Sequence, residues 1–125
     1  MCVLLVEDEP VIREIMAESL VDAGYDVVEA ASGDEAMAII RARAHPFTIL
    51  VTDFHMPGDS NGADVAACLR VEYPGLPVVI ASGRPDVFKP AWRTELGYGL
   101  LRKPYVPREL VALIRQMTGE GEPAA

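Results

Sequence analysis

The stretch TILVT at residues 48–52 runs directly into Asp53, and this pairing of an apolar run with a reactive polar residue decides the fold. A short, continuously apolar run is typical of a strand that is covered on both faces of a parallel sheet. The same arrangement recurs three times: residues 2–6 run into Glu7 and Asp8, residues 78–81 into Ser82, and residues 100–102 into Lys103. If all four runs are parallel strands, their carboxyl ends share one sheet edge, where open α/β sheets bind ligands.

Helical patterns separate these runs. Pro10 suits the first turn of a helix, and apolar residues then follow at three- and four-residue steps until a glycine cap at Gly24. Ser32 with Glu35 three residues later is a capping-box signature for a second helix. The predicted helices cover residues 10–23, 33–43, 63–72 (capped by Asn61 or Ser60), 91–96 and 107–117. Residues 25–30 form one further predicted strand, and the strand that contains the run 78–81 is predicted to begin at residue 76.

The fourth helix is predicted to be irregular. Pro85 and Pro90 lie between Gly83 and Gly97, and a proline inside a helix costs about 3 kcal/mol. We therefore expect a loop up to Pro90 and only a short helix after it. The alternation of strands and helices predicts an α/β fold with right-handed crossovers: a doubly wound, five-stranded parallel sheet of the flavodoxin-like type, in the order 2-1-3-4-5. Residues 1–118 are expected to form one domain, and residues 119–125 a flexible tail or the start of a linker.

The composition limits the classes of function. The chain has 125 residues, half of them hydrophobic, and a net charge of −8, which argues against binding nucleic acid through its phosphates. No apolar run approaches the roughly 20 residues that span a bilayer, and no signal peptide is visible, so no membrane association and a cytoplasmic location are expected. Cys2 and Cys68 lack metal-ligand spacing and are interpreted as reduced thiols in or near the core.

Three carboxylates are expected to converge at the sheet edge. Two carboxylates about 4 Å apart repel by roughly 1 kcal/mol in water and by about 4 kcal/mol at an effective dielectric constant of 20. Glu7, Asp8 and Asp53 in one pocket are therefore unfavourable unless a cation joins them, and an incomplete shell of oxygen ligands suits Mg²⁺. The alternative is that these acidic residues only solvate the loops that follow the strands.

An aspartate can also act as a nucleophile toward a phosphoryl group. Asp53 follows the central strand, so it is the candidate nucleophile. The Lys103 ammonium and the Ser82 hydroxyl would then neutralise or bind phosphoryl oxygens, and Gly83 would allow close backbone approach. Taken separately, Lys103 is more often a surface lysine and Ser82 a turn residue at a strand end.

Four motifs together resemble the receiver domain of bacterial two-component response regulators, the CheY-like superfamily. They are LLVEDEP at 4–10, VTDFHMP at 51–57, ASG at 81–83 and KP at 103–104. The resemblance implies that Asp53 is the phosphoacceptor. It also implies that Mg²⁺ is held by Glu7, Asp8, Asp53 and the main-chain carbonyl of His55, and that Ser82 and Lys103 bind the phosphoryl oxygens.

The resemblance further implies a phosphorelay module rather than an enzyme, with at most slow self-dephosphorylation. The phosphoryl donor would be a phosphohistidine on a sensor histidine kinase or a histidine phosphotransfer protein. Phosphorylation would alter binding to a protein partner whose identity the residues do not indicate. A stand-alone regulator, the receiver of a hybrid histidine kinase and a homodimer all stay open. The alternatives are a non-phosphorylated pseudo-receiver scaffold and an aspartyl-phosphate hydrolase.

Three features depart from the family pattern. The aromatic residue that usually lies three positions before the lysine, and that moves inward on phosphorylation, is replaced by Leu100. Tyr98 lies two residues earlier, on the same strand face if the strand extends that far, and is either a substitute for the aromatic residue or a cover for the core edge. The proline-containing segment Gly83–Trp92 also departs from the pattern, and Trp92 within it is either a partner-binding anchor or a core residue. The loop before Gly62 is one residue longer than usual.

Overall fold

The computed structural model describes residues 1–119 and contains a five-stranded parallel sheet in the order β2-β1-β3-β4-β5. This is the predicted flavodoxin-like topology. The strands are β1 (Cys2–Val6), β2 (Asp26–Ala30), β3 (Phe47–Asp53), β4 (Val78–Ser82) and β5 (Gly99–Arg102). The helices are α1 (Pro10–Asp22), α2 (Gly33–Ala42), α3 (Gly62–Glu72), α4 (Pro90–Thr94) and α5 (Pro107–Thr118). Of the tail predicted at 119–125, residues 120–125 lie outside the described part of the chain.

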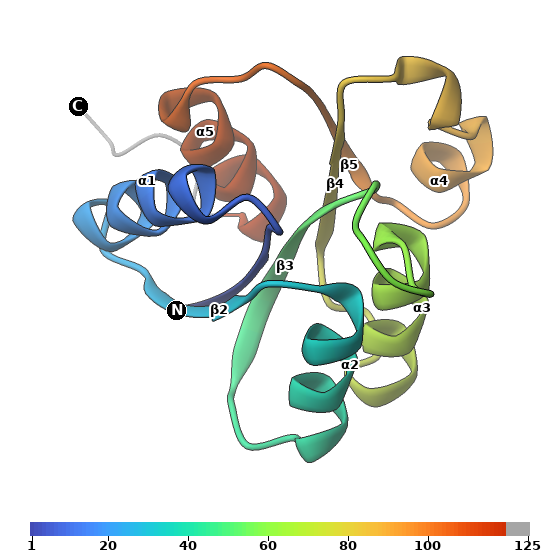
Figure 1. Cartoon of the computed structure of the whole chain (residues 1–125), viewed down its shortest axis with the longest axis horizontal. Coiled ribbons are helices and arrows are strands. Elements are labelled where there is room, and N and C mark those ends of the chain that lie inside the picture. The colour runs from blue at the N-terminus through green and yellow to red at the C-terminus, as the bar shows by residue number, and fades with distance from the viewer. Residues whose placement is uncertain (120–125) are drawn as a thin grey trace.

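Helices cover both faces of the sheet, with α1 and α5 on one side and α2, α3 and α4 on the other (Figure 1). The apolar run of β1 alternates between these layers, because Leu4 packs toward α2 and α3 while Leu5 packs toward α1 and α5. Both side chains are almost fully buried, and each such burial stabilises the fold by roughly 1.5–3 kcal/mol. A continuous apolar strand is therefore what a sheet covered on both faces requires.

The strand register aligns the polar residues at one edge. Val6 pairs with Thr52, so Glu7 and Asp53 are the next residues along two adjacent strands. Asp53 in turn pairs with Ala81, the residue before Ser82, on the other side. The predicted convergence of strand ends therefore occurs at the carboxyl edge of the sheet.

Two predicted strands begin later than expected because their first residues complete turns. The Tyr25 N–H donates to the Leu20 carbonyl at the end of α1, so β2 begins at Asp26. The Leu76 N–H donates to the Tyr73 carbonyl, so β4 begins at Val78 rather than at residue 76.

The segment between β4 and β5 is irregular, as the two prolines predict. A 3₁₀ turn at Pro85–Val87 precedes α4, which has only five residues and has Pro90 in its first turn. The Trp92 side chain points into the core and is 7% exposed. Of the two interpretations of Trp92, the structure supports the core residue.

The two cysteines are free, with Cys2 buried and Cys68 half-buried, as predicted. None of the helices in residues 1–119 combines the length and the apolar character needed to cross a lipid bilayer.

Candidate functional site

Three carboxylates meet where β1 and β3 end. One side-chain oxygen from each of Glu7, Asp8 and Asp53 lies within 4.8 Å of the others. The Glu7 N–H donates to the Ala30 carbonyl at 3.1 Å, which prolongs the pairing of β1 with β2 and holds Glu7 at the edge. Glu7 and Asp53 are each only 4% exposed, so their charges are largely removed from water. The predicted acidic cluster is therefore present.

Lys103 reaches this cluster from the end of β5. Its Nζ lies 2.6 Å from Asp53 Oδ1 and 3.5 Å from Glu7 Oε1. The Lys103 N–H donates to the Ser82 carbonyl at 2.9 Å, which ties the start of the β5–α5 loop to the end of β4, and the peptide bond to Pro104 is cis. One ammonium group thus contacts two buried carboxylates, and this contact excludes the interpretation of Lys103 as an ordinary surface lysine.

Burial controls the ionisation of Asp53. Removal from water raises the pKa of its carboxyl group above the usual value, because desolvation disfavours the charged form. The hydrogen bond and the charge of Lys103, and then the charge of His55, lower the pKa without cancelling this effect. The lysine therefore compensates only part of the cost of holding a carboxylate here.

The oxygen atoms of the cluster fit a small divalent cation. Within the described residues, Glu7 Oε2 and Asp53 Oδ2 are buried and have no hydrogen-bond partner. A buried, unpartnered carboxylate oxygen is costly, and hard oxygen donors in a small group are the ligands that Mg²⁺ takes from proteins. The donor set and the unpartnered oxygens therefore agree with the metal ligands expected from the sequence.

Ser82 lies at the same edge, but its hydroxyl group contacts its own loop. The hydroxyl accepts a hydrogen bond from the Arg84 N–H at 3.0 Å and donates one to the Arg84 carbonyl at 3.3 Å. Ser82 is 2% exposed. The structure thus places Ser82 beside the strand that carries Asp53, with its hydroxyl group bonded to Arg84 rather than to the carboxylates.

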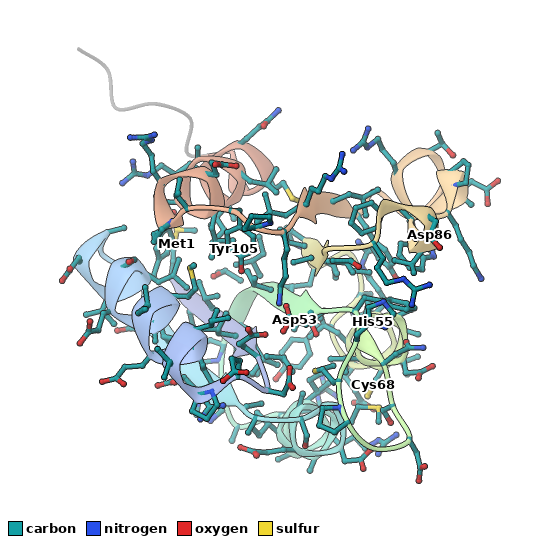
Figure 2. The ribbon with its side chains drawn as sticks, turned by 45° about the horizontal axis from the view of Figure 1, so that its top comes forward. Met1, Asp53, His55, Cys68, Asp86 and Tyr105 are labelled. Atoms are coloured by element: carbon teal, nitrogen blue, oxygen red, sulfur yellow. The ribbon has the colours of Figure 1, made fainter. Side chains whose placement is uncertain are left out.

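His55 and Tyr105 lie on opposite sides of Asp53 (Figure 2). The His55 side chain is exposed, its ring contacts Phe54 edge-on, and it is not part of the carboxylate cluster. Sequence analysis did not single out Tyr105. Burial, and then the charge of Asp53, raise the pKa of its phenol to about 12. Its position two residues after Lys103 was the signal that could have identified it.

A second feature absent from the sequence analysis is the contact between Phe54 and Trp92. Phe54 directly follows Asp53, and its ring centroid lies 5.6 Å from that of Trp92 in α4. Trp92 in turn lies 6.4 Å from the ring of Tyr98. Residues far apart in the sequence thus form an aromatic row beside the site, which no local pattern indicates.

Tyr98 covers the core edge. It is 5% exposed, shares a core layer with Leu100, and has the Arg70 guanidinium 5.0 Å above its ring. β5 begins at Gly99, so Tyr98 lies just before the strand and not on it, although its side chain packs into the same layer as Leu100. That Tyr98 replaces the missing aromatic residue stays a prediction, and an unchanged NMR environment of Tyr98 on activation by a phosphate mimic would contradict it.

The comparisons with known proteins agree with this geometry. The family profile described as the response regulator receiver domain matches residues 3–115. The chain belongs to this family. As a receiver domain of two-component systems it is a signalling module of phosphoacceptor type, and family members bind Mg²⁺ at an acidic pocket of the kind formed by Glu7, Asp8 and Asp53.

Relatives of this receiver domain occur in proteins of several kinds. It is 37% identical over 116 residues to the probable transcriptional regulator ycf27 of Porphyridium aerugineum, with 92% of this chain and 47% of that protein covered. It is 34% identical over 116 residues to the sensor kinase CckA of Brucella abortus, with 92% of this chain but 12% of that protein covered. The chain thus spans about half the length, or less, of these curated relatives.

Solved structures confirm the fold of the receiver domain. The receiver domain of the hybrid histidine kinase CckA superposes with a TM-score of 0.80 and 31% sequence identity, covering 94% of this chain and 99% of that one. A response regulator receiver protein from Sinorhizobium medicae superposes with a TM-score of 0.85 and 26% identity, covering 98% and 97% of the two chains.

Proposed function

We propose that Asp53 accepts a phosphoryl group from a phosphohistidine of a sensor histidine kinase or a histidine phosphotransfer protein. The observation that carries this proposal is the buried Asp53 carboxylate, bonded to Lys103 at 2.6 Å and crowded by Glu7 and Asp8. Phosphoryl transfer needs mainly positioning and neutralisation of the phosphoryl oxygens, and an ammonium group beside the acceptor contributes to both.

In the transfer, an Asp53 carboxylate oxygen attacks phosphorus while the bond from phosphorus to the donor imidazole nitrogen breaks. The imidazole leaves with the electron pair of that bond and takes a proton from water. The Lys103 ammonium group exchanges its contact with the Asp53 carboxylate for a contact with a phosphoryl oxygen, which now carries the negative charge. The Ser82 hydroxyl exchanges its bond to the Arg84 carbonyl for a bond to a second phosphoryl oxygen.

A Mg²⁺ ion held by Glu7, Asp8, Asp53 and the main-chain carbonyl of His55 would supply neutralisation of the remaining phosphoryl charge. The two unpartnered buried oxygens, on Glu7 and Asp53, support this ligand set. Because the modification changes the charge beside the Phe54–Trp92 contact, we infer that the phosphorylated domain binds its protein partner with a different affinity.

The receiver unit is proposed to comprise residues 1–118, used either as a stand-alone regulator or within a hybrid kinase. The aspartyl-phosphate formed on it would decay slowly by self-dephosphorylation. Hydrolases of related chemistry use two aspartates two residues apart, one as nucleophile and one as general acid. In this chain the residue two positions after Asp53 is the exposed His55. The absence of a second aspartate at this position therefore favours a phosphoacceptor over an enzyme that hydrolyses many equivalents of substrate.

Incubation with radiolabelled acetyl phosphate and Mg²⁺ tests the proposal. We expect up to one phosphoryl group per chain, located on Asp53 by mass spectrometry after borohydride reduction, and no label on the Asp53→Asn variant. Asp59→Asn, which removes an exposed carboxylate from the loop after β3, is the matched control and should be labelled normally. Release of many equivalents of phosphate would indicate a hydrolase. Absence of any label would leave the pseudo-receiver scaffold as the function.

A further inference from the structure

Arg13, in the first turn of α1, reaches back to the acidic end of β1. One of its guanidinium nitrogens, Nη1, donates a hydrogen bond to the main-chain carbonyl of Glu7 at 2.8 Å. Another, Nε, lies 3.4 Å from Glu29 Oε1 on β2, and the Arg13 side chain is only 21% exposed. A single arginine thus joins α1, the end of β1 and the neighbouring strand β2.

The bond to the Glu7 carbonyl fixes the backbone that carries two of the three clustered carboxylates. The Glu7 N–H already donates to the Ala30 carbonyl, so with Arg13 both polar groups of the Glu7 main chain are bonded. The Glu7 carbonyl belongs to the planar peptide unit that leads into Asp8, so its direction also sets the direction of the chain at Asp8. The Glu9 carbonyl accepts from the Arg13 N–H at 2.9 Å. Arg13 therefore holds the short loop between β1 and α1 at two carbonyl groups.

The two contacts of the Arg13 guanidinium differ in strength. The Glu29 side chain is 47% exposed, and an ion pair exposed to water contributes little. The bond to the Glu7 carbonyl has a charged donor and joins a residue that is only 4% exposed, so water competes with it less. The contact with Glu7 is therefore the one that can determine the geometry of the loop.

Arg13 acts through the backbone and not by pairing with the carboxylate cluster. Of the ion pairs in residues 1–119, the one that includes Arg13 is with Glu29, whereas Lys103 contacts carboxylates of the cluster directly. If only the positive charge of Arg13 mattered, it would repel a bound cation, and its removal would tighten cation binding. If Arg13 holds the ligands in place, its removal weakens cation binding. The two roles therefore predict changes of opposite sign.

We propose that Arg13 is a positioning residue for Mg²⁺. By holding the Glu7 carbonyl, it keeps the carboxylates of Glu7 and Asp8 directed at the ion, and this inference rests on the ligand set of the proposed function. The Glu7 main chain is bonded at both its polar groups while its side-chain Oε2 has no partner, which is the arrangement of a fixed ligand. Groups that hold metal ligands in place typically contribute about 10–100-fold to metal affinity.

Calorimetric titration of the metal-free protein with Mg²⁺ tests this inference. Arg13→Met removes the guanidinium group but keeps an apolar stem that can pack as the arginine stem does. We expect its Kd for Mg²⁺ to rise about tenfold or more, while its circular dichroism spectrum stays that of the folded protein. In the metal-free variant the NMR signal of the Asp8 amide nitrogen should also shift, because that nitrogen shares a peptide unit with the Glu7 carbonyl. This second measurement reports the lost bond without any cation.

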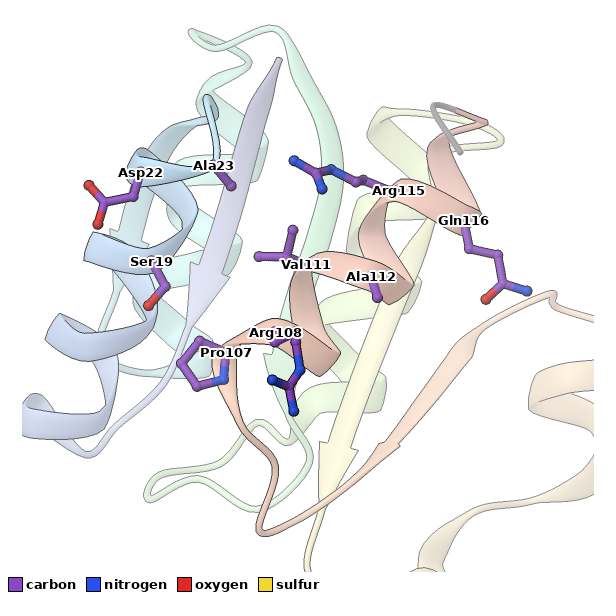
Figure 3. Close-up of a pocket in the computed structure, with 9 residues that line it drawn as sticks. All are labelled: Ser19, Asp22, Ala23, Pro107, Arg108, Val111, Ala112, Arg115 and Gln116. Carbon is purple, nitrogen blue, oxygen red and sulfur yellow. The ribbon is translucent and has the colours of Figure 1, made fainter. Parts of the chain in front are cut away.

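Two further variants serve as controls. Glu29→Gln breaks the ion pair but leaves the bond to Glu7, and should change the Kd by less than about twofold. Arg115→Met removes a half-buried arginine from α5, where it lines a groove of about 770 Å³ together with Ala23 just after α1 (Figure 3). It makes the same change in net charge outside the carboxylate cluster and should leave the Kd unchanged.

The outcomes separate this inference from the proposed function. An unchanged Kd in Arg13→Met would overturn the inference, and so would a lower Kd, which would show that the arginine acts by its charge. An equal rise in Glu29→Gln would assign the effect to the ion pair, and an equal rise in Arg115→Met would assign it to net charge. A wild-type protein that binds no Mg²⁺ would overturn the ligand set together with this inference. Because neither measurement uses a phosphoryl donor, the labelling of Asp53 by acetyl phosphate stays a separate result.

Discussion

Asp53 shows why a reactive side chain is costly to build into a fold. Its carboxylate follows a strand buried on both faces, so it lies among apolar residues and beside two other acids. Lys103 offsets part of the cost, yet the pKa of Asp53 stays above the usual value. The residue that carries the proposed chemistry is therefore also a source of instability at neutral pH.

The raised pKa of Asp53 has a measurable consequence for the stability of the fold. Because the folded state holds the Asp53 proton to a higher pH than the unfolded state, the unfolding free energy falls as pH rises between the two pKa values. Asn does not ionise, so in EDTA the unfolding free energy of Asp53→Asn should match that of the wild type in acid. As the pH rises through the folded-state pKa of Asp53, the variant should become more stable than the wild type. The gain is about 1.4 kcal/mol for each unit by which the folded-state and unfolded-state pKa values differ.

Urea unfolding between pH 3 and 8, a range that begins below the usual aspartate pKa of 3.8, measures this difference. Asp59→Asn controls for the change in net charge, since it removes an exposed carboxylate. A stability difference between Asp53→Asn and the wild type that stays constant or shrinks with rising pH would contradict the raised pKa.

At the scale of elements, the start of α3 positions the backbone that follows Asp53. Two candidates for its N-cap were open, and the structure assigns the role to Asn61, whose side chain accepts from the Asp64 N–H at 3.0 Å. The Asp64 carboxylate returns the bond by accepting from the Asn61 N–H at 2.9 Å. Ser60 instead donates to Asp34 at the start of α2. The loop between β3 and α3 thus contacts one helix and caps another.

The two capping candidates are separable by mutation. Asn61→Ala removes an N-cap and should lower the unfolding free energy by about 1 kcal/mol. Ser60→Ala removes only an exposed side-chain bond and should change it by less than about 0.5 kcal/mol. Chemical denaturation of both variants decides this assignment, and equal losses would show that the cap assignment is wrong.

Gly62, the first residue of α3, touches the backbone of Asp53. Its N–H donates to the Phe54 carbonyl at 2.8 Å, and a Cβ added to it would collide with the Asp53 carbonyl oxygen. Gly62→Ala should therefore cost about 1–3 kcal/mol through overpacking. Gly83→Ala, where a Cβ would lie 3.8 Å from Lys103 Cβ, should cost less than about 0.5 kcal/mol in the same denaturation experiment. If both variants are equally stable, the close approach at Gly62 is not real.

At the scale of the whole molecule, the sheet edge links cation binding to folding. The unfolded chain does not bring Glu7, Asp8 and Asp53 together, so a cation that binds them stabilises the folded state. The gain is about 2.7 kcal/mol when the free ion is at 100 times its Kd. Calorimetry should show a higher Tm in Mg²⁺ than in EDTA at constant ionic strength.

Neutralising one ligand tests whether the cluster is responsible for this gain. Asp8→Asn should lose most of the Mg²⁺-dependent rise in Tm. Glu9→Gln, which removes the exposed neighbouring carboxylate outside the cluster, should keep it. Equal rises in the two variants would mean that the ion binds elsewhere.

The sequence by itself determined the sheet and the identity of the residues at its edge. Apolar runs of strand length, each leading into Glu7, Asp53, Ser82 or Lys103, are typical of a parallel sheet covered on both faces, and parallel strands bring their ends together. Pro85 and Pro90 likewise predicted the irregularity of the segment that contains α4. These outcomes follow from local patterns, because strand and helix periodicity and proline geometry are properties of short segments.

Only the tertiary structure decided how the side chains are partnered. It turned Trp92 inward against Phe54 and brought Tyr105 within range of the Asp53 charge. Each of these depends on distances between segments that are remote in the chain, and burial sets the strength of the charges involved. Local periodicity carries no information about such distances, which arise only when the layers pack.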